Sequence, residues 1–185
     1  GLNKWGTGPL TNLFEAFRGT TKMNADIGTW GVSMVSNLAF TFMDADAFQG
    51  TGLETWNTER VTELSNTFRN ANEMNADIGK WAVSKVTTME RAFQGAAKFV
   101  GTGLEKWNIA GLTSGGLAYT FYDATSLTTC NKRKIADAWT PISAVFVDTS
   151  YDTDWNAATC PCVEGKYKDG TCKDCLPGTY TSAKD

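Results

Sequence analysis

Cysteine is the residue type with the clearest chemical potential in this chain. Cys160 and Cys162 form a C-x-C pair, and Cys172 and Cys175 form a C-x-x-C pair, which is a usual spacing for zinc ligands. The same thiols can form disulfides in an oxidising compartment. A fifth cysteine, Cys130, stands apart from the other four. Spacing alone leaves both a zinc site and disulfides open.

Histidine is absent from all 185 residues, which removes the commonest general base and the commonest metal ligand. Ser-His-Asp and Cys-His catalysis are therefore excluded. Carboxylates do recur, at Asp26 and Asp77 and at Glu54 and Glu105, but loop geometry alone produces recurrence at a fixed spacing. We predict that the chain is not an enzyme and uses no cofactor.

An acidic run could provide oxygen ligands to a calcium ion. Asp148, Asp152 and Asp154 lie within "VDTSYDTDW", yet this run lacks the Gly and the terminal Glu of an EF-hand loop. We interpret the run as a hydrated loop and predict no metal site.

The chain that would position these residues is built from repeats, and a tryptophan recurs once in each repeat. Trp5, Trp30, Trp56, Trp81 and Trp107 are separated by 25, 26, 25 and 26 residues. Aliphatic residues stand three positions before and five positions after each Trp; Leu or Met stands eight after and Phe twelve after, with two extra residues in the last repeat. The near copies "KMNADIGTWGVS" and "EMNADIGKWAVS" begin 51 residues apart, because two coil types alternate.

A fixed period of this length predicts a solenoid, in which each repeat buries its apolar face against the next. The spacing of Ile27, Trp30 and Val32 reads as L-x-x-L-x-L, the strand part of a leucine-rich repeat, and "VSNLAFTF" predicts a bend and a short helix. We predict an α/β repeat solenoid over residues 1–127, with five leucine-rich-repeat-like coils of short strand, bend and short helix.

The repeat resembles the BspA-type leucine-rich repeat of bacterial surface proteins, which is about 26 residues long. The likeness rests on "MNADIGTWGVSMVSNLAFTFMDADAF" and "MNADIGKWAVSKVTTMERAFQGAAKF", although Met23 and Met74 stand where that repeat has Phe. The resemblance implies a secreted or cell-surface protein whose repeats form a scaffold or an adhesive surface, without known catalysis.

The segment after the repeats resembles the cysteine-rich repeats of ephrin-receptor-like and TNF-receptor-like proteins, through "CKDCLPGTYTS". The resemblance implies an extracellular disulfide-rich module over residues 160–185 and favours disulfides over zinc. We then expect Cys130–Cys160 to staple a C-terminal cap, Cys162–Cys172 to close the small module, and Cys175 to pair beyond residue 185. The cap is predicted over residues 128–159, with these apolar residues covering the last coil: Ile135, Ala138, Trp139, Ile142, Val145, Phe146 and Trp155.

Residues beside the inward tryptophans are expected to point outward, because side chains alternate along a strand. We take them as the predicted stripe, a candidate ligand-binding face: Lys4, Thr29, Thr55, Asn57, Lys80, Lys106 and Asn108. A face that only keeps the protein soluble would use the same residue types. A hydroxyl ladder follows the repeat Val or Leu and either carries O-glycans, binds ordered water or satisfies the bend: Thr11, Ser36, Thr62, Thr87 and Thr113.

Charge and hydropathy argue against nucleic acid as a partner and against a membrane-spanning segment. The net charge is −3 and basic residues are scattered apart from "NKRK", so there is no electrostatic footprint for nucleic acid. No apolar stretch approaches the roughly 18 residues that span a membrane.

Two functions fit this sequence. The first is a non-enzymatic structural or adhesive module of a large extracellular or cell-surface assembly, such as a coat, a sheath or an appendage filament. Its partners would be other copies of itself or other extracellular structural proteins. The alternative is a receptor-like ectodomain that binds a specific glycan or protein on the predicted stripe.

The sequence shows no cap before the first coil. Gly1 and Leu2 begin inside a repeat, so we expect upstream coils or a neighbouring subunit to cover the layer of Leu2, Leu10, Leu13 and Phe17. We therefore expect residues 1–20 to be buried in the native assembly and to associate through that end when the chain is expressed alone.

Overall fold

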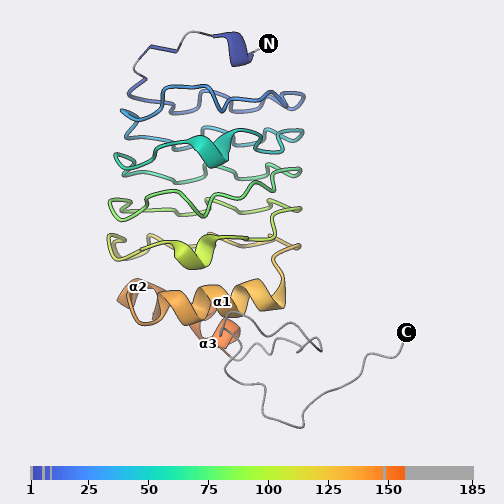
Figure 1. The fold of residues 1–185 in the computed structure, drawn as a ribbon. Helices are drawn as coiled ribbons and strands as arrows, with labels where there is room; N and C mark the ends of the chain where they lie inside the picture. Colours follow the sequence, from blue (N-terminus) through green and yellow to red (C-terminus); the bar gives the residue numbers. More distant parts are fainter. Residues whose placement is uncertain (1, 6, 9, 148, 157–185) are drawn as a thin grey trace, which may run out of the picture.

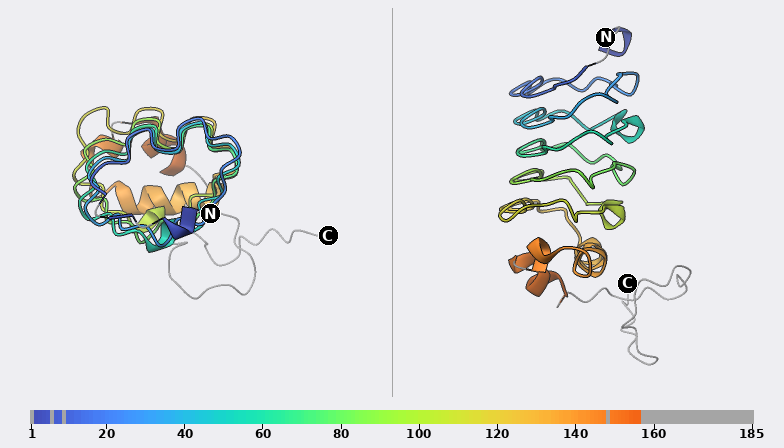
Figure 2. Two further views of the ribbon diagram at one scale, coloured as in Figure 1. Left: turned by 90° about the horizontal axis from the view of Figure 1, so that it is seen from above. Right: turned by 90° about the vertical axis from the view of Figure 1, so that its left-hand side faces the viewer.

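The chain forms a column of five stacked coils that is covered at one end by helices (Figure 1). The computed structural model describes residues 2–5, 7, 8, 10–147 and 149–156. We number the coils 1 to 5 by their tryptophans, from Trp5 to Trp107. Viewed along the column, successive coils lie almost exactly over one another (Figure 2).

Helices are short within the coils and longer after them. Three 3₁₀ helices, η1 (Leu2–Lys4), η2 (Leu53–Thr55) and η3 (Leu104–Lys106), each directly precede the Trp of coils 1, 3 and 5. Three α-helices follow the last coil: α1 (Thr129–Trp139), α2 (Ala144–Val147) and α3 (Ser150–Asn156). No described helix is long and apolar enough to cross a membrane.

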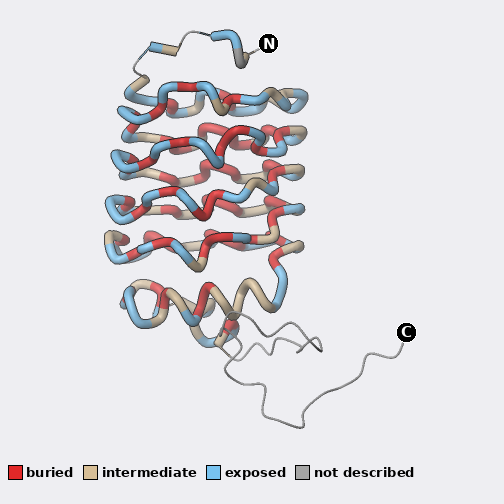
Figure 3. The backbone as a smooth tube through the Cα atoms, in the orientation of Figure 1, coloured by how far each residue is buried: buried red, intermediate tan, exposed pale blue. Residues whose placement is uncertain are grey.

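Aromatic ladders run through the middle of the column. Ring centroids of the Phe ladder are 5.4–5.6 Å apart from coil to coil, with Phe17, Phe42, Phe68, Phe93 and Phe121 in order. Trp56, Trp81 and Trp107 stack at 6.2–6.4 Å. Buried positions line the inside of every coil, whereas the corners are exposed (Figure 3). Coils 2 to 5 therefore bury their apolar side chains against the neighbouring coils and the cap, whereas coil 1 does so on one side only.

Hydrogen bonds between coils are concentrated in one segment, which we call the turn run; in coil 1 it spans residues 12–19. Every second N–H of this segment donates to a carbonyl of the following coil, at 2.8–3.1 Å. In coil 1 the donors are Leu13, Glu15, Phe17 and Gly19, and the acceptors are Asn37, Ala39, Thr41 and Met43. The same four bonds recur at each later junction. These alternate N–H groups of the turn runs therefore all point towards the C-terminal end of the column.

Intervening N–H groups of the turn run bond backwards within the same coil, as Thr41 does to Leu38 O at 3.2 Å. This alternation requires a left-handed residue in each turn run. The position is occupied by residues with φ between 54° and 59°: Glu15, Phe40, Asn66, Arg91 and Tyr119. A second left-handed residue follows four positions later in every coil, as at Asp44 and Gly95.

The predicted α/β repeat solenoid of leucine-rich-repeat-like coils is wrong. The described residues form no β-strand and no sheet; the β-type pairing between coils is limited to isolated parallel bridges, between Asn12, Asn37, Glu63 and Thr88. No described coil contains an α-helix, and "VSNLAFTF" forms turns instead of a bend and helix. The left-handed residues are the physical reason, since they reverse the chain before an extended run or a helical turn can propagate.

The near-identical twelve-residue stretches have a structural explanation. Asn24 Oδ1 accepts a hydrogen bond from Gln49 N, and Asp26 Oδ1 accepts one from Gly28 N. Asn75 and Asp77 repeat both bonds, with Val100 N and Gly79 N as donors. Gly52, at φ 96°, packs so closely on Gly28 that an added Cβ would lie 2.2 Å from Gly28 N. The Asn and the Gly of the motif therefore fit one coil type against the other.

The cap helices take the place of a sixth coil. Trp139 of α1 donates from Nε1 to Leu104 O at 3.1 Å, as Trp107 donates to Ile78 O one coil earlier. Of the residues predicted to cover the last coil, Ile135, Trp139, Phe146 and Trp155 are buried, Ala138 and Val145 are partly buried, and Ile142 is exposed.

No disulfide is formed among the described residues. Cys130, on α1, is a free thiol, so the predicted Cys130–Cys160 staple is not formed. The helix is held without it, because Asn131 Nδ2 bonds to Val100 O at 2.6 Å beside the Trp139 contact. Cys160, Cys162, Cys172 and Cys175, and the predicted disulfide-rich module of residues 160–185, lie outside the described residues.

Candidate interaction surfaces

The predicted stripe is exposed along its whole length, at Lys4, Thr29, Thr55, Asn57, Lys80, Lys106 and Asn108. Several of its polar groups make local hydrogen bonds. Thr55 Oγ1 donates to the carbonyls of Gly28 and Gly52 at 2.9 and 2.8 Å. Asn57 and Asn108 each accept a bond from the backbone N–H two residues later. The stripe thus carries three exposed lysines on a surface where Thr55 and the asparagines serve the fold.

The hydroxyl ladder also serves the fold. Thr62 Oγ1 donates to Ser36 O, Thr87 Oγ1 to Thr62 O, and Thr113 Oγ1 to Thr87 O, at 3.0–3.2 Å. Of the alternatives considered from the sequence, these contacts match a ladder that satisfies the bend between coils.

A different surface, which the sequence analysis did not single out, lies on the turn runs. We call it the arginine–aromatic face, and its members are Phe14, Arg18, Phe40, Arg69, Arg91, Tyr119 and Tyr122. The aromatic rings protrude, since Phe14, Tyr119 and Tyr122 are 49%, 55% and 54% exposed. Because each coil's turn run lies directly on the next, these residues follow one another along the same side of the molecule, with Arg69 half-buried in the middle.

Contacts between neighbouring coils order these side chains. Arg18 Cζ lies 5.9 Å from the centre of the Phe40 ring, and Arg91 Cζ lies 5.1 Å from that of Tyr119. The Phe14 ring packs edge-on against Phe40 at 5.7 Å. In cation–π contacts of this kind the guanidinium is held over an aromatic ring, and the edge of the guanidinium stays open to solvent.

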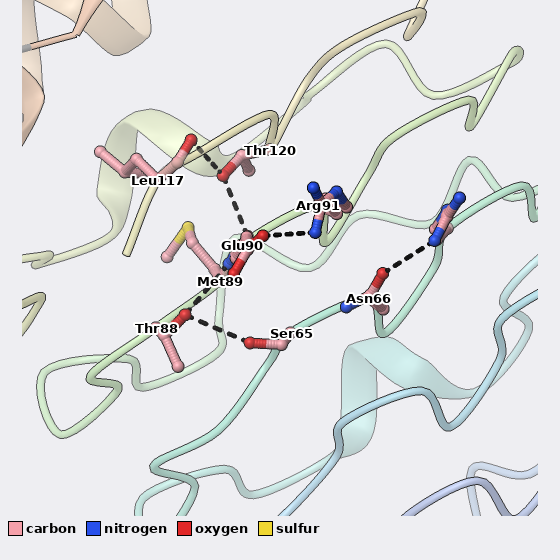
Figure 4. Close-up of polar contacts among 9 residues, drawn as sticks. Ser65, Asn66, Thr88, Met89, Glu90, Arg91, Leu117 and Thr120 are labelled. Atoms are coloured by element: carbon pink, nitrogen blue, oxygen red, sulfur yellow. Dashed lines mark hydrogen bonds and ion pairs between the residues drawn. The ribbon is translucent and has the colours of Figure 1, made fainter. Parts of the chain in front are cut away.

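Figure 4 shows the middle of the face, where polar side chains of neighbouring turn runs make an ion pair and hydrogen bonds. Arg91 pairs with Glu90, and Ser65 and Thr88 bond through their hydroxyls at 3.2 Å. Below the surface, Arg69 Nε and Gln94 Oε1 are buried without a hydrogen-bond partner. Such groups are uncommon in native proteins, so two on neighbouring coils mark this part of the column.

Sequence reasoning missed this face because it assigned the segment to a bend and a short helix. A signal was present nonetheless. Nine to thirteen positions after each Trp, where a solvated turn would carry Gly, Asn or Ser, the chain has Phe14, Phe40, Arg69, Arg91 and, after the insertion, Tyr119.

The head end, formed by coil 1, is open. The carbonyls of Asn12, Phe14, Ala16 and Arg18 correspond to those that accept bonds in later coils, but no described group donates to them. Trp5 is 60% exposed, although it stacks on Trp30 at 6.1 Å. The structure thus leaves backbone acceptors and an apolar ring uncovered at the same end.

The tail end, below coil 5, is partly covered by α1 and α3. In coils 1 to 4, the N–H of the ladder Phe donates to a carbonyl of the following coil. The equivalent N–H in coil 5, that of Phe121, donates to the Tyr151 hydroxyl at 3.2 Å. Trp155 packs on the Phe121 ring at 5.2 Å. Burial raises the pKa of Tyr151 above its ordinary 10.0, and the Phe121 bond offsets part of that rise.

Carboxylates do not converge on a metal site in the described part of the chain, where no group of three or more Cys, Asp or Glu residues could hold an ion. The interpretation of the acidic run as a hydrated loop is wrong for Asp152 and Asp154, which lie on α3; Asp148 lies outside the described residues. Asp152 accepts hydrogen bonds from Thr140 Oγ1, at the C-terminal end of α1, and from Asn156 Nδ2, both at 2.7 Å. Asp26 and Asp77 are occupied by the glycine N–H bonds described above.

Comparison with known proteins corrects the resemblances drawn from the sequence. The chain matches neither the BspA-like leucine-rich repeats nor the ephrin-receptor-like and TNF-receptor-like cysteine-rich repeats; a different family matches almost all of the described residues. No curated protein and no solved structure matches the chain. The family model aligns twice, with residues 1–107 and with residues 42–154, in keeping with an internally repeated chain. The chain therefore belongs to the family described as "Mycoplasma protein of unknown function, DUF285".

Proposed function

We propose that this chain is a non-enzymatic structural or adhesive module that binds other proteins through its arginine–aromatic face. The module would belong to a large extracellular or cell-surface assembly, with copies of itself or other structural proteins as partners. The extracellular location is supported by the cysteine-rich composition of residues 160–175.

One observation carries the proposal. Phe40, Arg91 and Tyr119 occupy the left-handed position of the turn run, where a bulky side chain costs more than Asn or Gly. Asn66 fills the same position in coil 3 and shows that the cheaper residue fits. Strained residues that recur at one surface position support a functional role for their side chains.

The residue types on this face suit protein recognition. Arg and Tyr are enriched among the residues that contribute most to protein–protein affinity, because they combine large contact area with directional hydrogen bonds. The cation–π contacts of Arg18 and Arg91 restrict those side chains before binding, which lowers the entropy lost on association.

Asparagine substitutions separate a functional role from a structural one. Tyr119→Asn and Arg91→Asn should leave the thermal midpoint unchanged or raise it, because Asn tolerates the left-handed conformation better. Both should nevertheless reduce the fraction of chain recovered in the native high-mass assembly, measured by size-exclusion chromatography with light scattering.

Lys80→Asn, on the predicted stripe of coil 4, is the matched control and should assemble normally. Normal assembly of both variants of the arginine–aromatic face would contradict the proposal. Loss of assembly or ligand binding in Lys80→Asn alone would favour the receptor-like alternative.

A further inference from the structure

The polarity of the hydrogen bonds between coils determines what can cover the head end. In the turn runs, four N–H groups of each coil donate to four carbonyls of the next. Coil 1 consequently presents only acceptors from its turn run: the carbonyls of Asn12, Phe14, Ala16 and Arg18. The direction is reversed at the corner, where Ser36 N donates to Thr11 O, and again after the turn run, where Ala47 N donates to Thr21 O. The N–H of Thr11 corresponds to that donor and meets no described acceptor.

We propose that the head end is a docking surface for one further coil of this same repeat pattern. The occupant must offer four N–H donors at alternate residues, a carbonyl at the corner and a carbonyl after the turn run, in the order that the coils of this chain offer them. It must also bring apolar side chains over Trp5 and Phe17. A preceding coil, with Phe in the turn run and an aliphatic residue before its Trp, meets all of these requirements.

A second copy of the described chain does not meet them. Two head ends placed together would set acceptors against acceptors, so the buried carbonyls would stay unpaired, which disfavours that contact. A head end placed on a tail end meets helices α1 and α3, which already cover Phe121. The direction of the hydrogen bonds between coils therefore favours a further coil, and not a second head end, as the group that covers the head end.

The repeat itself supplies the probe. Gly1-Leu2 corresponds to Gly52-Leu53, so a copy of residues 22–51 placed directly before Gly1 adds one coil in the correct register. A shuffled version of the same thirty residues is the control of equal composition.

Trp5 provides the readout. It is 60% exposed, whereas the other six tryptophans are at most 7% exposed, so quenching of tryptophan fluorescence by acrylamide reports mainly on Trp5. The added coil should reduce this quenching to the level of the Trp5→Phe variant and raise the thermal midpoint. Hydrogen exchange should show protection at the copied Leu38, Phe40, Phe42 and Asp44 amides. The shuffled extension should change none of these.

Two outcomes would overturn the proposal. One is an added coil whose amides exchange as in an unfolded chain while Trp5 stays open to acrylamide. The other is a concentration-dependent dimer of residues 1–185, detected by sedimentation, in which Trp5 is protected without any added coil. Neither measurement involves the arginine–aromatic face, so this test is independent of the proposed function.

Discussion

Trp56 and Trp5 occupy the same position in their coils but differ in burial, at 4% and 60% exposed. Trp56→Ala should lower the free energy of unfolding by about 3–5 kcal/mol, because it leaves a cavity between Phe42 and Trp81 and removes the bond to Ile27 O. Trp5→Ala should cost less than about 1 kcal/mol. Urea titration of both variants checks this difference, and equal losses would contradict it.

At the scale of single residues, much of the core could be predicted from the sequence. The aliphatic residues placed around Trp30, Trp56, Trp81 and Trp107 by the period are buried, because burial of large side chains determines the register. Phe48 and Phe99, which stack at 4.3 Å on Phe42 and Phe93, were not predicted. They occur in alternate coils only, so a pattern common to all coils does not contain them.

At the scale of elements, the contact between coil types depends on paired glycines. Gly52→Ala should destabilise the protein by several kcal/mol, since its Cβ would lie 2.2 Å from Gly28 N at an already unfavourable φ of 96°. Gly19→Ala is the matched control, with φ 70° and no atom within 4 Å of the added Cβ, and should cost about 1 kcal/mol. Similar thermal midpoints would refute the close approach.

The cap gives a pH-dependent prediction. At a pH well below 10.0, Tyr151 is neutral whether the chain is folded or unfolded. Its raised folded pKa means that the unfolded chain loses the proton first as the pH rises past 10.0, so stability falls from there upwards.

Tyr151→Phe should lose about 1 kcal/mol at neutral pH, because Phe121 N–H loses its acceptor, and the alkaline loss should become shallower. Thermal unfolding between pH 8 and 11 measures both effects. Tyr122→Phe, which removes an exposed hydroxyl, should retain the alkaline loss of the parent; an unchanged pH profile in Tyr151→Phe would contradict the assignment.

Elements were predicted less well than residues. The spacing of Ile27, Trp30 and Val32 fits a strand, but Trp30 N bonds back to Ile27 O and Val32 N to Trp30 O, which makes turns. The left-handed φ of Phe40 and its equivalents determines that the chain turns here. The residue types at that position differ from coil to coil and do not predict this conformation. The arginine–aromatic face lies on these turns. Because the sequence analysis assigned the segment to a bend and a short helix, it did not predict that these side chains share one face.

For the whole molecule, the repeat unit is two coils, not one. Deletion of residues 27–77 joins Asp26 to Ile78 within the common "NADIG" text, so Asn24 can bond Val100 N as Asn75 does. The shortened chain should fold cooperatively with its cap in place and melt at a lower temperature, because stacked repeats contribute roughly additively.

Deletion of residues 27–52 removes one coil and is the control. It joins Asp26 to Leu53 and eliminates both the Asp26 bond to Gly28 and the glycine contact. This variant should be less stable than the one that lost two coils. Calorimetry of both chains checks the order of their thermal midpoints, and the reverse order would show that the coils are interchangeable.

The uniform direction of the bonds between turn runs also gives the column an electric axis. Each peptide unit carries a dipole of about 3.5 D, and the four turn-run bonds of each junction point the same way and outnumber the bonds that run in the reverse direction, at the corner and after the turn run. The negative pole lies at the head end, where the chain begins, which is the reverse of an α-helix. Cations are therefore favoured there, and Lys4 and Arg18 are exposed on coil 1. Every coil added in register would lengthen this axis and move its negative pole outwards.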